Sequence, residues 1–591
     1  MCSITCKINI SYEKIKQRIS EIFHSRVFII NLLAVIVGLI AGLGVIVFYI
    51  LTSYCSYLAD LYLKFMEHKF GFLGGKAAVV SSIIIGALIV GILNVIIIKS
   101  AEHAVPSIIK SMALYGGRMD VIPKAVSIFA ATITIGSGGS AGPEGPAALI
   151  GAVSASGFGQ KLKLTDKEMS LLILCGTSAG IGAIFRAPFG GVLFGLEVLL
   201  PEIAITTAIP VFLSTTIAVA VATLFFGGTS EFFVPYTITY SFEELPIFTL
   251  EGLVFGFFSA IWIKIFESGE IFFEKLNIPK TYKPAIGAFL TGIIAIFYPQ
   301  IMGTGVTEIE KALLGQYTLT VFLILAFLKM IATTATLGSG GRGGIFAPTF
   351  YIGAMLGGAW GSLFSTILPD IVKNPQAYAL VGMGAFFAGA SRTPLTNIIL
   401  ISEISGNYLF IIPLMLATPL SYLISSSLVS EDIYTFSFKR EGIYLIRGHR
   451  EDILSLIQIG DIMNTSVITL DPKIRVFQAI EIMERYRVDG FPIVDENGNL
   501  VGIVTDDDIL HAMREHKESS KIEEIMRKNV ITIFPYQTAQ EALNLMDKYD
   551  IGRIPVVDPE NPRKIIGIIT RNNILEAYRI KIIMRRRLER V

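Results

Sequence analysis

The stretches GPEGPAALIGA (residues 142–152) and GIFAPTFYIGA (residues 344–354) repeat one pattern of glycine and proline, and this repeat decides the fold. Three pairs match at an offset of 202 residues: Gly142 with Gly344, Pro146 with Pro348, and Gly151 with Gly353. A second block, FRAPFGGVLFGLEV (185–198), matches SRTPLTNIILISEI (391–404) at an offset of 206 residues. Because two separate blocks recur in the same order, the sequence predicts two related halves.

The composition is that of a membrane protein with a soluble C-terminal part, because 52% of the 591 residues are hydrophobic and only 16% are charged. A bilayer core needs roughly 20 apolar residues of helix. Seven stretches approach that length: 27–51, 77–98, 206–226, 250–266, 284–297, 319–336 and 409–428. Between them lie shorter apolar pieces broken by Gly and Pro: 125–135, 147–155, 171–184 and 189–200. Broken helices at membrane depth are tolerated where they are buried or line a polar cavity. We therefore expect a polytopic α-helical fold with its site between the halves.

A carboxylate, Glu144, lies at the start of one broken helix, with Gly145 beside it and Pro146 as the expected first helical residue. Glycine-rich turns that enter helices expose N–H groups without intrahelical acceptors, and the helix dipole adds positive charge. Two such helix starts facing each other would bind a small anion. An ionised Glu144 would occupy that site itself, so we predict a gate that opens on protonation or on displacement by an anion. The alternative is a carboxylate that only caps its helix.

The soluble part is itself a repeat, in which residues 460–510 match residues 523–575 and Pro492 aligns with Pro555. Each copy has the pattern of a helix, a short apolar strand, a turn, a second strand and a second helix. One copy is too small to be stable alone, so the two are predicted to pack as a pair.

In their order and spacing, GPEGP (142–146), GIFAP (344–348) and the C-terminal repeat resemble the CLC chloride channels and proton-coupled chloride transporters, with a C-terminal pair of CBS domains. The resemblance covers about residues 27–580. We expect the following parts: a cytoplasmic N-terminal helix (1–26), a CLC-type transmembrane domain (27–435), a linker (436–456), CBS domain 1 (457–515), CBS domain 2 (521–580) and a basic tail (581–591).

The resemblance implies a gating role for Glu144 and an anion site at Gly145 and at the backbone N–H groups of Ile345 and Phe346. It also implies a coordinating tyrosine after the last membrane helix. Tyr434 fits this place, and Tyr444, in the linker, is a competitor.

The family's third anion-coordinating loop has the pattern GSGIP, and this chain has EHAVP (102–106) there, with His103 at the position of the coordinating serine. A neutral imidazole would donate one hydrogen bond, and a protonated one would add charge. The alternative is a histidine that caps a helix or contacts solvent.

Family members that exchange chloride for protons usually carry a second glutamate after the position of Glu197, where this chain has Val198. We therefore expect a voltage- and pH-sensitive passive channel for chloride or a similar small anion, with a proton-coupled antiporter as the alternative. Glu197 and Glu403 are expected to be buried structural carboxylates. A CBS-regulated divalent-cation transporter would need acidic side chains in its pore. No catalytic cluster or metal site is evident, so an enzyme is not expected.

In the CBS pair, GIVTDDD (502–508) resembles the family's contact to an adenine nucleotide, which implies roles for Thr505 and Asp508, and more weakly for Thr570 and Asn573. CBS pairs also act as purely structural dimerisation modules. No cofactor besides such a nucleotide is expected. The resemblance implies a homodimer, and we expect it in the cell membrane, in contact with lipid and with its CBS domains in the cytoplasm. A net charge of +1 gives no indication of a nucleic-acid partner.

Overall fold

The computed structural model describes residues 26–99, 102–200, 205–227, 238–440, 454, 457–486, 488–549 and 551–578. The chain divides into two units, Met1–Leu445 and Ile446–Val591. Several predicted features lie outside the described residues: residues 1–25 of the N-terminal helix, most of the linker, Tyr444 and the basic tail.

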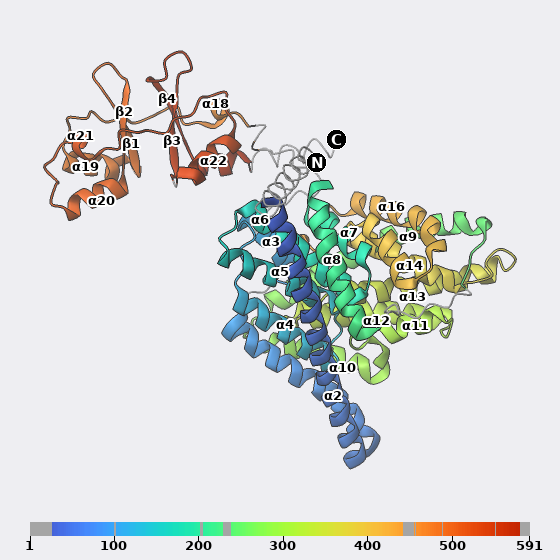
Figure 1. The fold of residues 1–591 in the computed structure, drawn as a ribbon. Coiled ribbons are helices and arrows are strands. Elements are labelled where there is room, and N and C mark those ends of the chain that lie inside the picture. The colour runs from blue at the N-terminus through green and yellow to red at the C-terminus, as the bar shows by residue number, and fades with distance from the viewer. Residues whose placement is uncertain are drawn as a thin grey trace, which may run out of the picture. The chain divides into compact units, whose positions relative to one another are not determined.

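The first unit consists of helices (Figure 1). Its first half contains α2 (Arg26–Leu93), η1 (Asn94–Ile98), α3 (Ala104–Leu114), α4 (Val121–Gly136), α5 (Glu144–Lys161), α6 (Asp166–Phe185), α7 (Pro188–Leu199) and α8 (Ile205–Phe226). Its second half contains η2 (Phe242–Glu244), α9 (Leu245–Lys275), α10 (Lys283–Phe297), η3 (Pro299–Ile301), α11 (Val306–Leu313), α12 (Leu319–Gly338), α13 (Phe346–Ile367), α14 (Gln376–Ser391), α15 (Pro394–Ser405), η4 (Tyr408–Phe410), α16 (Ile411–Leu428) and α17 (Phe436–Arg440).

Seven helical segments among the described residues are long and apolar enough to cross a membrane. α2 and η1 together cover the first two predicted spans, and the non-helical backbone of Gly71 (φ 68°) separates the two parts of α2. The hydroxyl groups of Tyr62 and Ser81 hydrogen-bond at 3.1 Å between those parts. α6 and α13 are 20 and 22 residues long, so the piece predicted at 171–184 is part of a full-length helix. α17 falls in the segment predicted as linker, but it packs on the first unit through a ring contact between Phe436 and Phe266.

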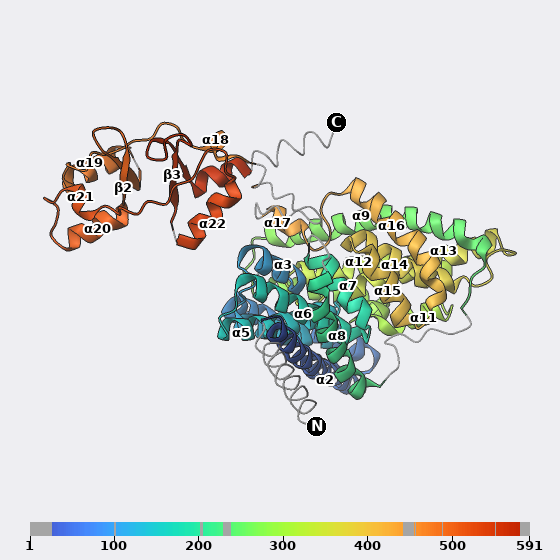
Figure 2. The same ribbon diagram turned by 45° about the horizontal axis from the view of Figure 1, so that its top comes forward.

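The two halves use the same helix packing. In Figures 1 and 2, α3 to α8 gather on one side of this unit and α9, α13, α14 and α16 on the other. α5 meets α6 where Gly151 contacts the backbone of Gly176, and α13 meets α14 where Gly353 contacts the backbone of Gly382. A Cβ atom at Gly353 would lie 2.5 Å from the Gly382 carbonyl oxygen. Gly151 and Gly353, which match in the repeat, are therefore places where two helix backbones touch.

The second unit contains two antiparallel hairpins, with β1 (Gly490–Val494) paired to β2 (Leu500–Thr505) and β3 (Arg553–Val557) paired to β4 (Ile565–Thr570). Short helices flank them: α18 (Ile459–Ile462), α19 (Val476–Tyr486), α20 (Asp506–Arg514), α21 (Ile522–Ile525) and α22 (Ala539–Tyr549). Residues 571–578, after β4, are also helical, so the helix, strand, strand, helix order of each copy is as predicted.

The two copies of this unit interleave. Asn464, near the start of the first copy, exchanges both backbone hydrogen bonds with Ile568 of β4 at 2.9 Å each. Arg527, near the start of the second copy, does the same with Ile503 of β2, at 2.9 and 3.1 Å. Because each copy extends the sheet of the other, neither has a complete sheet by itself.

Candidate functional site

The two glycine-rich turns meet at the centre of the first unit. Gly142 donates its backbone N–H to the carbonyl of Gly344, and Gly344 donates to the carbonyl of Gly142, both at 2.7 Å. Equivalent contacts flank this bridge: the N–H of Ser140 donates to the Thr336 hydroxyl at 3.2 Å, and the N–H of Arg342 donates to Thr134 at 3.1 Å. The repeat found in the sequence is therefore a local two-fold arrangement in space.

This bridge holds two helix starts against each other. α5 begins at Glu144, and α13 begins at Phe346. The expectation that Pro146 is the first helical residue is wrong, because the helix begins two residues earlier. Proline is tolerated at the third position because the first N–H groups of a helix have no intrahelical acceptor. Both helix starts thus present backbone N–H groups to the same region.

Glu144 is 1% exposed, and its carboxylate folds back over the bridge. A Cβ atom on Gly142 would overlap this carboxylate, and one on Gly344 would lie 2.7 Å from its Oε2. Only glycine at these two positions leaves room for the carboxylate. The side chain is thus a negative group placed between two helix N-termini, where negative charge is stabilised.

One cavity brings together all six residues predicted for the anion site. It is lined by Glu144, Gly145, Ile345, Phe346, Tyr434 and His103, and by further side chains that include Phe194, Phe266 and Glu270. Tyr434 is 3% exposed, and its ring contacts Phe194 edge-on. These residues come from both halves and from the segment after α16.

The side chain of Phe346 belongs to a cluster of aromatic rings. Its ring centroid lies 4.0 Å from that of Phe387, 4.7 Å from Phe350, 5.0 Å from Phe185 and 5.7 Å from Phe194. The side chain of Phe346 is thus fully used in packing against other rings. If Phe346 binds a polar ligand, it does so through its backbone N–H group. This geometry agrees with the role that the family resemblance implies.

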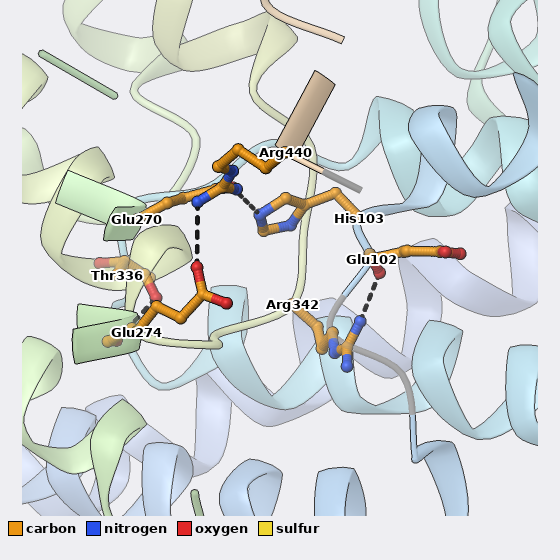
Figure 3. Close-up of polar contacts among 8 residues, drawn as sticks. Glu102, His103, Glu270, Glu274, Thr336, Arg342 and Arg440 are labelled. Atoms are coloured by element: carbon orange, nitrogen blue, oxygen red, sulfur yellow. Dashed lines mark hydrogen bonds and ion pairs between the residues drawn. The ribbon is translucent and has the colours of Figure 1, made fainter. Parts of the chain in front are cut away.

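His103 occupies the N-cap position of α3, but its side chain makes no capping hydrogen bond. Its Nε2 atom lies 3.0 Å from Oε1 of Glu270 on α9. Arg440 contacts Oε2 of the same carboxylate, and its Nη1 lies 3.2 Å from Oε2 of Glu274. Figure 3 shows Glu270 between the imidazole and the guanidinium. The sequence reasoning missed Glu270, although an acidic pair spaced by four residues near the end of an apolar helix was a visible signal.

Glu197 and Glu403 cap each other's repeat-related helices. Glu403 accepts the backbone N–H groups of Phe189 and Gly190 at the start of α7, at 3.1 and 2.7 Å. Glu197 accepts those of Leu395 and Thr396 at the start of α15, at 3.1 and 2.8 Å. This arrangement fits the structural role expected for both carboxylates.

Lys329 was not singled out in the sequence, although a lone lysine in a membrane-length apolar run is unusual. It is fully buried in α12. Its ammonium group donates to the carbonyls of Ile301 and Gly303, both at 2.9 Å, and lies 4.9 Å from the ring centroid of Tyr351. These contacts join α12 to the turn before α11.

The four residues predicted for a nucleotide form two local capping motifs in the second unit. Thr505 caps α20 and donates its hydroxyl to Asp508 at 2.8 Å. Asp508 also accepts from Nε of Arg527 at 2.9 Å. In the second copy, the hydroxyl of Thr570 donates to Oδ1 of Asn573 at 2.6 Å, and this copy lacks the carboxylate.

The fold defines a class: a polytopic helical membrane protein of two repeated halves, joined to a tandem of small α/β domains. Comparison with known proteins identifies the family within this class to which the chain belongs. The family described as voltage gated chloride channel matches residues 85–426, more than half of the chain, and the CBS domain family matches residues 459–515 and 522–580. The chain belongs to this chloride channel family, the CLC family, and carries a C-terminal CBS pair.

Individual relatives agree with this assignment. The chain is 28% identical over 362 residues to a putative chloride channel protein ClcB-like from Ralstonia nicotianae, over 61% of this chain and 82% of that protein. Its fold is similar to a crystal structure of a eukaryotic CLC transporter, with a TM-score of 0.68, 18% identity and coverage of 93% and 99% of the two chains. A structure of a slow cyanobacterial Cl−/H+ antiporter gives a TM-score of 0.65 at 21% identity, covering 71% and 98%. At these identities, the two structures show the fold alone.

Proposed function

We propose that this protein conducts chloride, or a similar small anion, passively across the membrane and that Glu144 is its gate. The observation that carries the proposal is the position of the Glu144 carboxylate, folded over the Gly142–Gly344 bridge in a cavity lined by two helix starts. Backbone N–H groups and helix dipoles hold an anion without a fixed cation. Such a site binds weakly enough to release the ion again.

The gate follows from competition for this one site. The ionised carboxylate of Glu144 is a tethered anion and excludes a free one. Protonation removes its charge, and a high anion concentration displaces it, so flux rises as the pH falls and as chloride increases.

Passive conduction is supported by Val198. This side chain is 2% exposed on α7 and stands where proton-coupled family members usually have a glutamate. An apolar side chain cannot relay a proton, so a direct inner step toward Glu144 is missing at this position.

A specific observation favours the alternative, a proton-coupled antiporter. The His103–Glu270 pair lines the same cavity as Glu144. A titratable pair there offers protons a second route that avoids Val198.

The accessory features belong to the same proposal. The protein forms a homodimer in the cell membrane, with the CBS pair in the cytoplasm. Thr505 and Asp508 contact an adenine nucleotide that regulates the pore, and Thr570 and Asn573 form a weaker second site. The carboxylate of Asp508 supports the stronger first site, since Asn573 lacks that charge.

The test is chloride efflux from proteoliposomes containing the full chain, with valinomycin to balance charge and with protein-free liposomes as the control. Efflux that requires the protein and grows as the pH falls from 8 to about 5 supports a pH-gated anion pathway. The proposal is wrong if efflux equals that of protein-free liposomes at every pH.

A further inference from the structure

The two nitrogen atoms of His103 have different surroundings. Nε2 is 3.0 Å from the Glu270 carboxylate. Nδ1 is buried and has no hydrogen-bond partner among the described residues. Figure 3 shows Nε2 turned toward Glu270 and Arg440, with Nδ1 turned away from that carboxylate.

The Glu270 contact fixes which nitrogen carries the proton. An ionised carboxylate only accepts hydrogen bonds, so Nε2 must be the protonated nitrogen of a neutral imidazole. Nδ1 then carries a lone pair, which repels an anion. When the ring gains a second proton, Nδ1 becomes an N–H donor and the ring becomes a cation. One proton therefore turns an imidazole that lines this cavity from a neutral ring into a cation, which attracts an anion.

Groups on several elements act on this imidazole. Glu270 on α9 contacts it directly, while Arg440 on α17 and Glu274 on α9 act through Glu270. Glu144 and Tyr434 line the same cavity, and the ring of Phe266 lies 6.0 Å away between centroids.

The preceding residue, Glu102, belongs to a separate set of charges. Its carboxylate pairs with Lys110 and Lys124, and its carbonyl accepts from Arg342 at 2.7 Å. Glu270 is thus the carboxylate that directly contacts the His103 ring.

We propose that His103 is a proton-linked anion ligand and that Glu270 is its positioning residue, so that an anion binds at this end of the cavity together with a proton. The inference rests on the proposed anion function and adds a second pH-dependent element to it, separate from the Glu144 gate. By linkage, a proton at His103 strengthens anion binding by the same factor by which the anion strengthens proton binding.

The test measures proton uptake on chloride binding. Titration calorimetry of the detergent-solubilised full chain, repeated in buffers of different ionisation enthalpy, gives the number of protons taken up per chloride. All measurements use the Glu144→Gln background, which removes titration of the gate. This background is compared with three double variants that add His103→Ser, Glu270→Gln or His68→Gln. His68, exposed on α2, is the matched control.

We expect the Glu144→Gln protein and the His68 control to take up a proton with chloride between about pH 5 and 8. His103→Ser should abolish this uptake, while its hydroxyl keeps a hydrogen-bond donor in the cavity. Glu270→Gln should move the uptake to lower pH by about one unit, because the imidazolium loses its opposite charge.

Two results would overturn this inference and leave the anion function intact. One is that His103→Ser binds chloride with unchanged proton uptake. The other is that Glu270→Gln binds chloride with an unshifted pH range of proton uptake. If His103→Ser also lost chloride binding, the Glu270→Gln variant, which keeps the imidazole, would decide. Absence of chloride binding in the Glu144→Gln protein itself would overturn the proposed function, and this inference with it.

Discussion

Gly142 and Gly344 exchange both of their backbone hydrogen bonds at 2.7 Å, although 202 residues separate them in the chain. This bridge joins the two halves and sets two helix starts face to face. The Glu144 carboxylate lies over the bridge in space that a Cβ atom on either glycine would take. The gate and the fold thus depend on the same two residues.

Substitution of Gly344 tests whether backbone N–H groups at the helix starts bind the anion. Gly344→Val should weaken chloride binding at least about tenfold, or about 1.4 kcal/mol. The reason is that a Cβ atom there would lie 2.7 Å from both the Gly145 nitrogen and Glu144 Oε2, so the helix start must shift. Ile345→Val, which changes only a side chain, is the matched control and should bind normally. A density map at high bromide should show an anion near the N–H groups of Ile345 and Phe346, and its absence there would count against the site.

Neutralising the gate separates conduction from its pH control. Glu144→Gln should conduct and lose the pH dependence that the gate contributes, because a neutral amide competes poorly for an anion site, whereas the contribution of His103 remains. Efflux from proteoliposomes across a pH series measures this, with Glu67→Gln, an exposed change on α2, as the control. If the Glu144 variant keeps the wild-type pH profile, Glu144 is not the gate.

The reciprocal caps predict equal losses of stability. Glu197→Gln and Glu403→Gln should each lower the free energy of unfolding by about 1–3 kcal/mol, because one amide oxygen cannot replace the carboxylate that two helical N–H groups share. Thermal unfolding in detergent measures the change, and both variants should still conduct chloride. Unchanged stability together with altered proton movement would contradict the structural role and indicate a proton relay.

The CBS pair should bind an adenine nucleotide unequally at its two sites. Asp508→Ala should weaken binding of ATP to the full chain more than Asn573→Ala does, because only Asp508 supplies a charged acceptor. Asp506→Ala, an exposed change in the same helical turn, is the control. Equal affinity in all three variants would contradict the roles of Asp508 and Asn573, and absence of ATP binding to the unmodified chain would leave the pair a structural module.

Much of this arrangement was predictable because a repeat constrains contacts across long distances in the chain. The matching glycine and proline motifs identified the residues that meet at the bridge, and all six residues predicted for the anion site line one cavity. A periodic pattern cannot identify a partner that lies outside the repeat. Glu270 on α9 meets His103 at the N-cap of α3 across 167 residues of sequence, and no local signal encodes that meeting.

The predicted length of α6 was wrong for a different reason. α6 is rich in glycine, serine and alanine, and it is almost entirely buried among other helices. Hydropathy reports contact with lipid, so a helix that packs mainly on protein gives a weak signal. The start of α5 was misplaced because proline is allowed at any of the first helical positions that lack an acceptor.

The reversal potential of the chloride current, measured across a membrane with chloride and pH gradients imposed independently, tests the central claim most directly. With Val198 in place of a proton-accepting side chain, the account predicts a reversal potential at the chloride equilibrium value that does not move when the pH gradient is changed. A reversal potential displaced by the pH gradient in a fixed ratio, with protons driven uphill by chloride, would contradict passive conduction and identify the protein as an antiporter.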